Sequence, residues 1–136
     1  MAVIWAWRSR YVIVITAMLN ADEQLIDDTF DFLPAVEDFG KPANGADLRL
    51  GLATAPALFA WESNPELGPL IRRKFDAPGD VELARELVMK SDGIERTQQL
   101  ARQFAAEARA LVERLPESPA RDQLVELTVK VVDRRK

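Results

Sequence analysis

Apolar residues repeat at three- and four-residue intervals in the second half of the chain, and this spacing constrains the fold more than any other feature. Between residues 93 and 115 they are Leu100, Phe104, Ala108, Leu111 and Leu115. Because an α-helix completes a turn every 3.6 residues, these side chains share one helical face. No strand-type alternation persists in the sequence, although residues 11–16 are rich in β-branched side chains. The pattern therefore predicts an all-α fold.

Proline and glycine residues mark where the other expected helices begin and end. These helices are predicted over residues 10–33, 48–63, 65–75, 80–90 and from Pro119 onward, with a loop at 34–46. Pro56 lies inside the second of them and should kink it, because proline has no N–H to donate. Asp92 and Glu95 have the spacing of a capping box. Ser118 before Pro119 is typical of a helix start.

Composition narrows the chemistry that is open to this chain. Its 136 residues include no histidine and no cysteine, and 22 acidic against 18 basic side chains give a formal net charge of −4. Histidine-based catalytic triads and Cys/His zinc sites are therefore excluded. Metal binding would depend on oxygen ligands, which favours hard cations such as Mg²⁺. The acidic balance also argues against a nucleic-acid partner.

The first 20 residues are open to two interpretations. They contain Arg8 and Arg10, no acidic residue, and an apolar run at 11–19. A short apolar run after basic residues is a feature of targeting segments, but the same run can also begin a buried helix. It is too short to span a bilayer, which needs about 20 apolar residues. We favour the buried helix.

Three aspartates near residue 30 form the candidate metal site. Asp27 and Asp31 are four residues apart and share one face of the first predicted helix, with Asp28 at its flank. Carboxylate oxygens in this arrangement can hold Mg²⁺ and leave coordination positions for water and phosphate oxygens. The alternative is a solvated acidic face, because an Asp-Asp-x-x-Asp pattern often arises from composition alone.

Three polar residues around this motif add weaker signals. Gln24 lies one helical turn before Asp27 and either donates to a phosphate oxygen or is a surface amide. Lys41 lies in the predicted loop, where its ammonium group either meets a phosphate as a point charge or stays exposed. Asp47 begins the next predicted helix and suits the role of its N-cap.

Together, these residues resemble the trans-isoprenyl diphosphate synthase family. The likeness is carried by the motif at 24–32, which reads Gln-Leu-Ile-Asp-Asp-Thr-Phe-Asp-Phe, by Phe-Gly-Lys-Pro at 39–42, and by the Asp and Thr-Ala-Pro positions within 47–56. Downstream, Pro-Gly-Asp-Val at 78–81 and Ser-Asp-Gly-Ile-Glu-Arg-Thr at 91–97 are similar to the long-chain polyprenyl branch. That branch includes the enzymes that make the ubiquinone side chain.

The resemblance implies a fold and a reaction. In this family two aspartate-rich motifs face each other across a cavity in a helical bundle and bind Mg²⁺. This chain would supply the C-terminal helices of such an isoprenoid-synthase-type bundle, which would be incomplete. The implied enzyme is a transferase that adds an allylic diphosphate to isopentenyl diphosphate and makes a long-chain polyprenyl diphosphate.

The resemblance also assigns roles to individual residues. The Mg²⁺ ligands, directly or through water, would be Asp27, Asp28 and Asp31. Asp47 would support the metal from outside its ligand shell. Gln24 and Lys41 would contact the diphosphate of the allylic substrate.

The resemblance has a boundary just before Gln24. Residues 1–20 contain nothing like the first aspartate-rich motif of the family, and Asp22 and Glu23 stand where a small apolar and an aromatic residue are typical. We therefore expect an atypical, helical N-terminal segment at 1–23 and a synthase-type part at 24–136. A truncated or misassembled gene product with an unrelated N-terminus would explain the boundary. Such a chain would be inactive alone, because half of the metal site would be missing.

Three functions stay open at this point. The first is Mg²⁺-dependent polyprenyl diphosphate synthesis, with this chain as the diphosphate-binding region. The second is a non-catalytic helical partner of a full-length synthase, and the third is an unstable by-product without a function. The family is usually dimeric or hetero-oligomeric. The likeness to ubiquinone-type enzymes implies a mitochondrial location, with the cytoplasm as the alternative.

Overall fold

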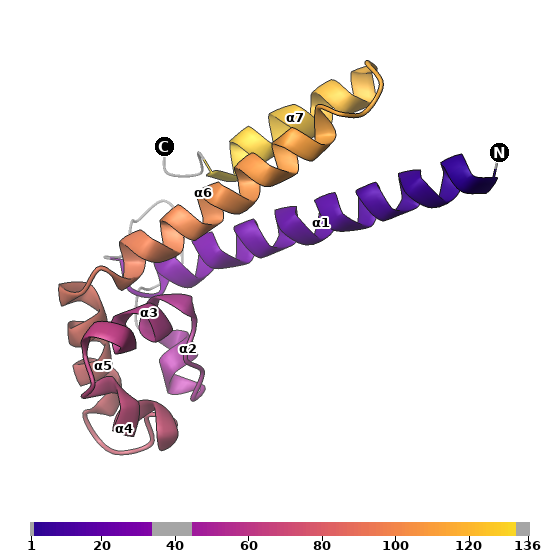
Figure 1. Cartoon of the computed structure of the whole chain (residues 1–136). Coiled ribbons are helices and arrows are strands. Elements are labelled where there is room, and N and C mark those ends of the chain that lie inside the picture. The colour runs from indigo at the N-terminus through magenta and orange to yellow at the C-terminus, as the bar shows by residue number, and fades with distance from the viewer. Residues whose placement is uncertain (1, 34–44, 133–136) are drawn as a thin grey trace. The chain divides into compact units, whose positions relative to one another are not determined.

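The computed structural model describes residues 2–33 and 45–132, and within these ranges every regular element is a helix (Figure 1). The helices are α1 (Ala2–Phe30), α2 (Ala46–Arg49), α3 (Ala55–Ser63), α4 (Leu67–Arg72), α5 (Asp80–Lys90), α6 (Gly93–Val112) and α7 (Pro119–Val132). The predicted all-α fold is confirmed. The helix expected over 10–33 is present as α1, which begins earlier, at Ala2.

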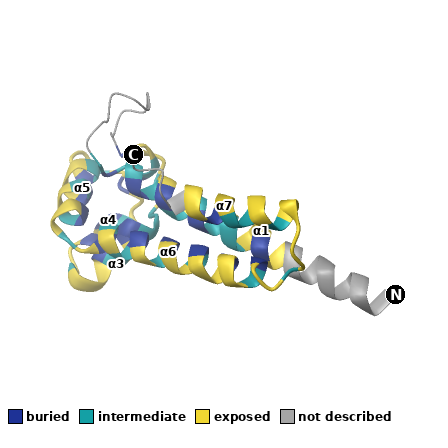
Figure 2. Ribbon diagram, turned by 90° about the horizontal axis from the view of Figure 1, so that it is seen from above, coloured by how far each residue is buried: buried dark blue, intermediate teal, exposed yellow. Residues whose placement is uncertain are grey.

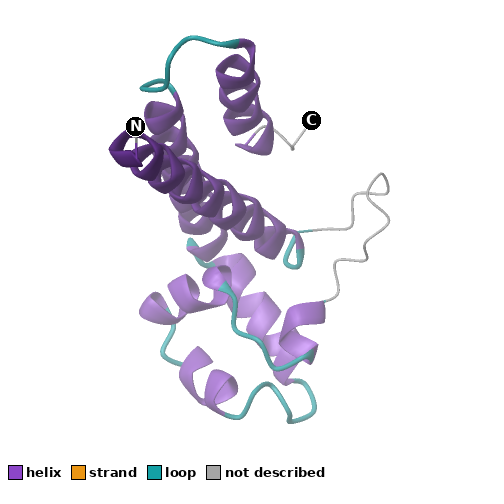
Figure 3. Ribbon diagram, turned by 90° about the vertical axis from the view of Figure 1, so that its right-hand side faces the viewer, coloured by secondary structure: helices purple, strands orange, loops and turns teal. Residues whose placement is uncertain are grey.

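The described residues form two compact units. The first unit contains α1 up to Gln24 together with residues 100–132, and the second unit contains residues 25–99. In the first unit α6 and α7 run antiparallel as a helical hairpin, which Figures 1 and 3 show from two directions. No helix in the described ranges is long and apolar enough to cross a membrane.

Small side chains line the buried face of α6 in the first unit. The buried positions are Ala101, Ala105, Ala108 and Val112, and the predicted apolar residues Leu100, Phe104 and Leu111 are half-buried beside them (Figure 2). The predicted face is therefore correct, but its most buried line runs through alanines. A small side chain allows neighbouring backbones to approach closely, whereas the larger residues cover the edges of the contact.

α1 buries a charged residue on its inner face in the first unit. Ile15 and Asp22 are seven residues apart, so they lie on the same face, and both are buried. Neither carboxylate oxygen of Asp22 has a hydrogen-bond partner among the described residues. Burial, and to a smaller extent the neighbouring charge of Glu23, raises the pKa of Asp22 to about 6.

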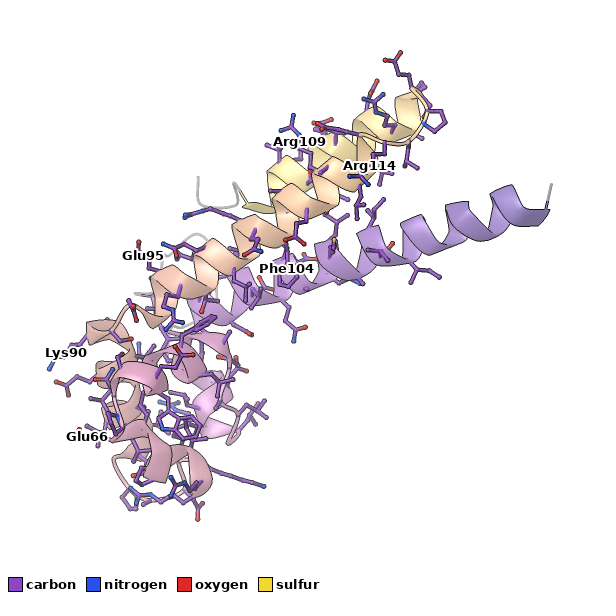
Figure 4. The ribbon with its side chains drawn as sticks, in the orientation of Figure 1. Glu66, Lys90, Glu95, Phe104, Arg109 and Arg114 are labelled. Carbon is purple, nitrogen blue, oxygen red and sulfur yellow. The ribbon has the colours of Figure 1, made fainter. Side chains whose placement is uncertain are left out.

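The second unit packs around a single apolar cluster. Its buried members are Phe32, Leu48, Ala57, Ala60, Leu67, Leu70, Phe75, Ala84 and Val88. α5 contacts α2, α3 and α4 and so joins the helices that surround this cluster. Charged residues on the outside, such as Lys90 and Glu95, point away from the ribbon (Figure 4).

The continuous helix predicted over 48–63 is wrong. Two helices, α2 and α3, take its place. Gly51 has a φ of 79°, in the left-handed region, and lies just beyond the end of α2. Pro56 then falls in the first turn of α3, where a missing N–H breaks no intrahelical hydrogen bond. The proline therefore starts a helix and does not kink one.

The two predicted helix starts near the C-terminus have different outcomes. Ser118 caps α7 as predicted, since its Oγ accepts a hydrogen bond from the N–H of Arg121 at 3.2 Å. At the start of α6, Asp92 directly precedes the helix as predicted, and its carbonyl accepts a hydrogen bond from the N–H of Arg96 at 2.9 Å. The side-chain acceptor at this helix start is Ser91, whose Oγ accepts a hydrogen bond from the N–H of Gly93 at 3.0 Å.

Lys74 follows α4 in a left-handed conformation, with a φ of 56°. The N–H of Lys74 donates to the carbonyl of Ile71 at 3.0 Å, and that of Phe75 donates to the carbonyl of Leu70 at 2.9 Å. This is a Schellman motif, in which the position of Lys74 favours glycine.

We expect Lys74→Gly to raise the free energy of unfolding by about 1 kcal/mol in urea denaturation, because the left-handed strain is removed. Arg72→Gly, at the exposed last residue of α4, should lower it by at most about 1 kcal/mol; equal losses in both variants would contradict the prediction.

Candidate metal and diphosphate site

The acidic residues of the candidate site come from two helices of the second unit. Asp27 and Asp28 lie in the last turn of α1, and Asp31 follows the end of that helix. Asp47 is the second residue of α2. Asp27 is exposed, whereas the other three side chains are half-buried. The fold therefore brings a residue from α2 to the motif at the end of α1.

Asp31 links the end of α1 to the start of α2. Its Oδ1 accepts a hydrogen bond from the N–H of Ala46 at 2.7 Å, and its Oδ2 accepts one from the N–H of Asp47 at 3.2 Å. Gly45, in the N-cap position of α2, has a φ of 65° and offers no side chain for capping. The predicted N-cap role of Asp47 is therefore wrong, because the helix begins two residues earlier than expected, at Ala46, and Asp31 supplies the cap.

Asp28 is the most perturbed carboxyl group of the motif. Its pKa is raised from an ordinary value of 3.8 to about 6. Burial is the largest cause, followed by the negative charge of Asp47 and then by those of Asp27 and Asp31. Asp47 thus repels Asp28 more strongly than the two neighbours in sequence do.

The donor set fits a hard cation that is shared with a ligand. Among the described residues, no three acidic side chains converge closely enough to hold a metal ion by themselves. Mg²⁺ usually binds one or two carboxylates and takes its remaining ligands from substrate phosphates and water. Asp28 and Asp47 offer two carboxylates on different helices, which matches that requirement.

Comparison with known proteins identifies the family. No family model matches the chain. A probable mitochondrial hexaprenyl pyrophosphate synthase from Yarrowia lipolytica is 54% identical over 113 residues, which are 83% of this chain and 25% of that protein. The chain belongs to the trans-isoprenyl diphosphate synthase family. It spans about a quarter of the length of the curated relatives that it matches first.

Solved polyprenyl synthases share the fold of this chain. The heptaprenyl diphosphate synthase of Staphylococcus aureus has a TM-score of 0.81 and 28% identity, covering 93% of this chain and 40% of its own. A polyprenyl synthase from Caulobacter crescentus, solved with calcium and isoprenyl diphosphate, has a TM-score of 0.75 and 34% identity, covering 94% and 40%. The predicted incomplete isoprenoid-synthase-type bundle is therefore confirmed.

The remaining predicted residues of the synthase site are less fully described. Gln24 is exposed on α1, one helical turn before Asp27. Lys41 lies outside the described residues. Thr54, from the Thr-Ala-Pro sequence that resembles the family, is the N-cap residue of α3. Its carbonyl accepts hydrogen bonds from the N–H groups of Ala57 and Leu58 at 3.0 and 3.1 Å.

Proposed function

We propose that this chain forms a diphosphate-binding part of a long-chain polyprenyl diphosphate synthase. The observation that carries the proposal is the 54% identity to a hexaprenyl synthase over 113 of 136 residues. A continuous match of that length includes residues 24–113 wherever it begins, and so includes the whole acidic site. Within the second unit Asp47 lies close enough to Asp28 for its charge to raise the pKa of Asp28, and this closeness supports the same function.

In this role the carboxylates bind a divalent cation and the polar side chains bind the diphosphate. Asp27, Asp28 and Asp47 would hold Mg²⁺, whereas Gln24 and Lys41 would donate to the oxygens of an allylic diphosphate. Bound Mg²⁺ neutralises the negative charge that develops on a departing diphosphate. The half-buried position of Asp28 lowers the local dielectric and so strengthens its attraction for a cation.

The proposal extends to the reaction and the compartment by similarity alone. The acceptor of the allylic chain would be isopentenyl diphosphate, and the product would be a polyprenyl diphosphate of the ubiquinone type. The chain corresponds to a quarter of its relatives, so we propose that it binds diphosphate without transferring prenyl groups by itself. A mitochondrial location follows from the Yarrowia relative, which is named as mitochondrial.

The chain should bind inorganic pyrophosphate only when Mg²⁺ is present. Asp28→Asn is expected to weaken this binding by about 100-fold, because even groups outside the ligand shell cost about 10- to 100-fold when they are removed. Isothermal titration calorimetry at constant ionic strength measures the effect. Glu107→Gln is the matched control, since it removes the same charge from an exposed position on α6. Equal losses in the two variants, or binding that needs no Mg²⁺, would refute the proposal.

Exposed apolar side chains favour a second candidate function. In the second unit Leu50, Leu52, Leu58 and Trp61 are between 38% and 75% exposed. Where such side chains form one contiguous patch, that patch marks a surface that binds another protein. The chain would then be a non-catalytic helical partner of a full-length synthase. Association with such a synthase in sedimentation, together with no Mg²⁺-dependent pyrophosphate binding, would favour this second function over the first.

A further inference from the structure

Asp31 uses both of its carboxylate oxygens on the backbone of α2, through hydrogen bonds from the N–H groups of Ala46 and Asp47. We propose that Asp31 is a positioning residue, which holds Asp47 beside Asp28 and does not itself bind the cation. This inference rests on the proposed function and assigns different roles to the three aspartates of the motif.

The hydrogen bonds of Asp31 direct its carboxylate toward α2. A carboxylate that accepts backbone N–H groups forms charge-assisted bonds, which are shorter and stronger than neutral ones. A cation on the same two oxygens would weaken these bonds, because it would draw negative charge away from the acceptors that the first N–H groups of α2 use. Asp27 is exposed, and Asp28 is half-buried among the charges of the motif. Those two residues and Asp47 are therefore better placed to bind a cation than Asp31 is.

α2 depends on Asp31 because it is short and weakly fixed by other groups. It has four residues, of which Leu48 is buried in the apolar cluster. At its start, a Cβ on Gly45 would lie 2.9 Å from Cδ of Arg85, so α5 packs closely against this end. Leu48 and the contact with α5 fix one side of the helix. The carboxylate of Asp31 accepts a hydrogen bond from the N–H of Asp47, and so fixes the backbone position from which the Asp47 side chain extends.

Nuclear magnetic resonance of the whole ¹⁵N-labelled chain tests this role, with Mn²⁺ as a paramagnetic probe and inorganic pyrophosphate as the anion. In the native chain, bound Mn²⁺ should broaden the amide signals of Asp28 and Asp47 together. Asp31→Ala should raise the solvent exchange rates of the Ala46 and Asp47 amides by about tenfold, because each loses its acceptor. It should also lower the relaxation rate that Mn²⁺ induces at the Asp47 amide relative to the rate at Asp28, because this rate falls steeply with distance from the cation. A general loss of stability would not separate these two signals.

Two further variants complete the experiment. Asp31→Asn keeps one carbonyl oxygen as an acceptor and should restore part of the broadening at Asp47. Asp27→Ala, the matched control from the same motif, should weaken the broadening at Asp28 and Asp47 alike and leave the exchange rate of Ala46 unchanged.

The possible results separate this inference from the proposed function. Faster exchange at Ala46 and Asp47 when diamagnetic Mg²⁺ and pyrophosphate bind the native chain would overturn it, since the cation would then have taken the oxygens of Asp31. Unchanged exchange in Asp31→Ala would also overturn it. A native chain without Mn²⁺-dependent broadening would refute the proposed function instead, and amide protection that is lost in Asp31→Ala would still support Asp31 as the anchor of α2.

Discussion

Asp22→Ala is expected to raise the free energy of unfolding by about 3 kcal/mol at pH 7 and by much less at pH 4. Asp22 is buried on the inner face of α1, and its two carboxylate oxygens have no hydrogen-bond partner among the described residues. Burial, with a smaller effect of Glu23, raises its pKa from 3.8 to about 6. Each pKa unit corresponds to about 1.36 kcal/mol, so the ionised side chain costs about 3 kcal/mol at neutral pH.

The pH dependence of this effect has a definite sign. Between pH 4 and pH 6 the folded chain holds the proton of Asp22 while the unfolded chain has released it. Stability therefore falls as the pH rises through this window, and the full penalty is present above pH 6. Below pH 4 both states are protonated and the penalty disappears. Asp22→Ala removes the titrating group, so the gain should grow from pH 4 to pH 7 and then stay constant.

Urea denaturation followed by circular dichroism at several pH values measures this gain. Asp22→Asn should stabilise less than Asp22→Ala at pH 7, because the buried amide still lacks partners. Asp122→Asn is the control, at an exposed acid in the first turn of α7, and should lower stability slightly because it removes a charge that favours a helix start. A gain in Asp22→Ala that is the same at pH 4 and pH 7 would contradict the assigned cause.

The burial of Asp22 shows what helical spacing can predict. Ile15 and Asp22 are seven residues apart, and the sequence already marked Asp22 as an acid where a small apolar residue is typical. The helical face that it occupies follows directly from the 3.6-residue period. Its lack of a hydrogen-bond partner does not follow from the sequence, because a partner would have to come from other elements.

The break between α2 and α3 shows where local signals become ambiguous. Gly51 and Pro56 can interrupt one helix or separate two, and both arrangements satisfy the rules for glycine and proline. The packing of Leu48 into the apolar cluster of the second unit decides between them, because it orients α2 as a separate element. Tertiary contacts of this kind cannot be seen in a window of neighbouring residues.

Only part of the candidate site could be predicted from the sequence, because the rest also depends on tertiary contacts. The four-residue spacing of Asp27 and Asp31, with Asp28 at its flank, was enough to mark all three as possible ligands on one helix. In the structure α1 ends at Phe30, so Asp31 lies just beyond it. The hydrogen bond between Asp31 and Ala46 joins residues 15 positions apart, and no periodicity rule reaches that far. One feature of the sequence did point to this contact. Gly45 precedes α2 and has no side chain that could cap it. Such a helix start needs an acceptor from elsewhere.

Gly93→Ala is expected to lower the free energy of unfolding by about 3 kcal/mol. Gly93 begins α6 within the second unit, where an added Cβ would lie 2.3 Å from the carbonyl oxygen of Pro56 and 3.1 Å from Cβ of Ala60. The first distance is far below van der Waals contact, and the oxygen belongs to the backbone of α3, so it cannot turn away. Overpacking of this kind costs about 1 to 3 kcal/mol, and a rigid neighbour places the cost at the upper end.

Nearby contacts leave the start of α6 little freedom to shift. The guanidinium of Arg96 lies 4.5 Å from the ring centroid of Phe59 and is 2.7 Å from Oε2 of Glu62, both on α3. Moving α6 to make room for the methyl group would stretch these contacts as well. Urea denaturation of Gly93→Ala should therefore show a lower midpoint with an unchanged slope.

Gly68→Ala is the matched control for this prediction, because Gly68 is also helical and is also closely approached. Its added Cβ would lie 2.8 Å from Nε1 of Trp61, so the close neighbour is a side chain, 38% exposed, and not a backbone atom. Alanine is also a better helix former than glycine by about 1 kcal/mol, which offsets a small displacement of the indole ring. The two substitutions add the same methyl group, so a large loss in Gly93→Ala alone assigns the effect to the backbone oxygen of Pro56. Similar losses in both variants would show that side-chain crowding is sufficient, and the close approach of α6 to α3 would then not be the cause.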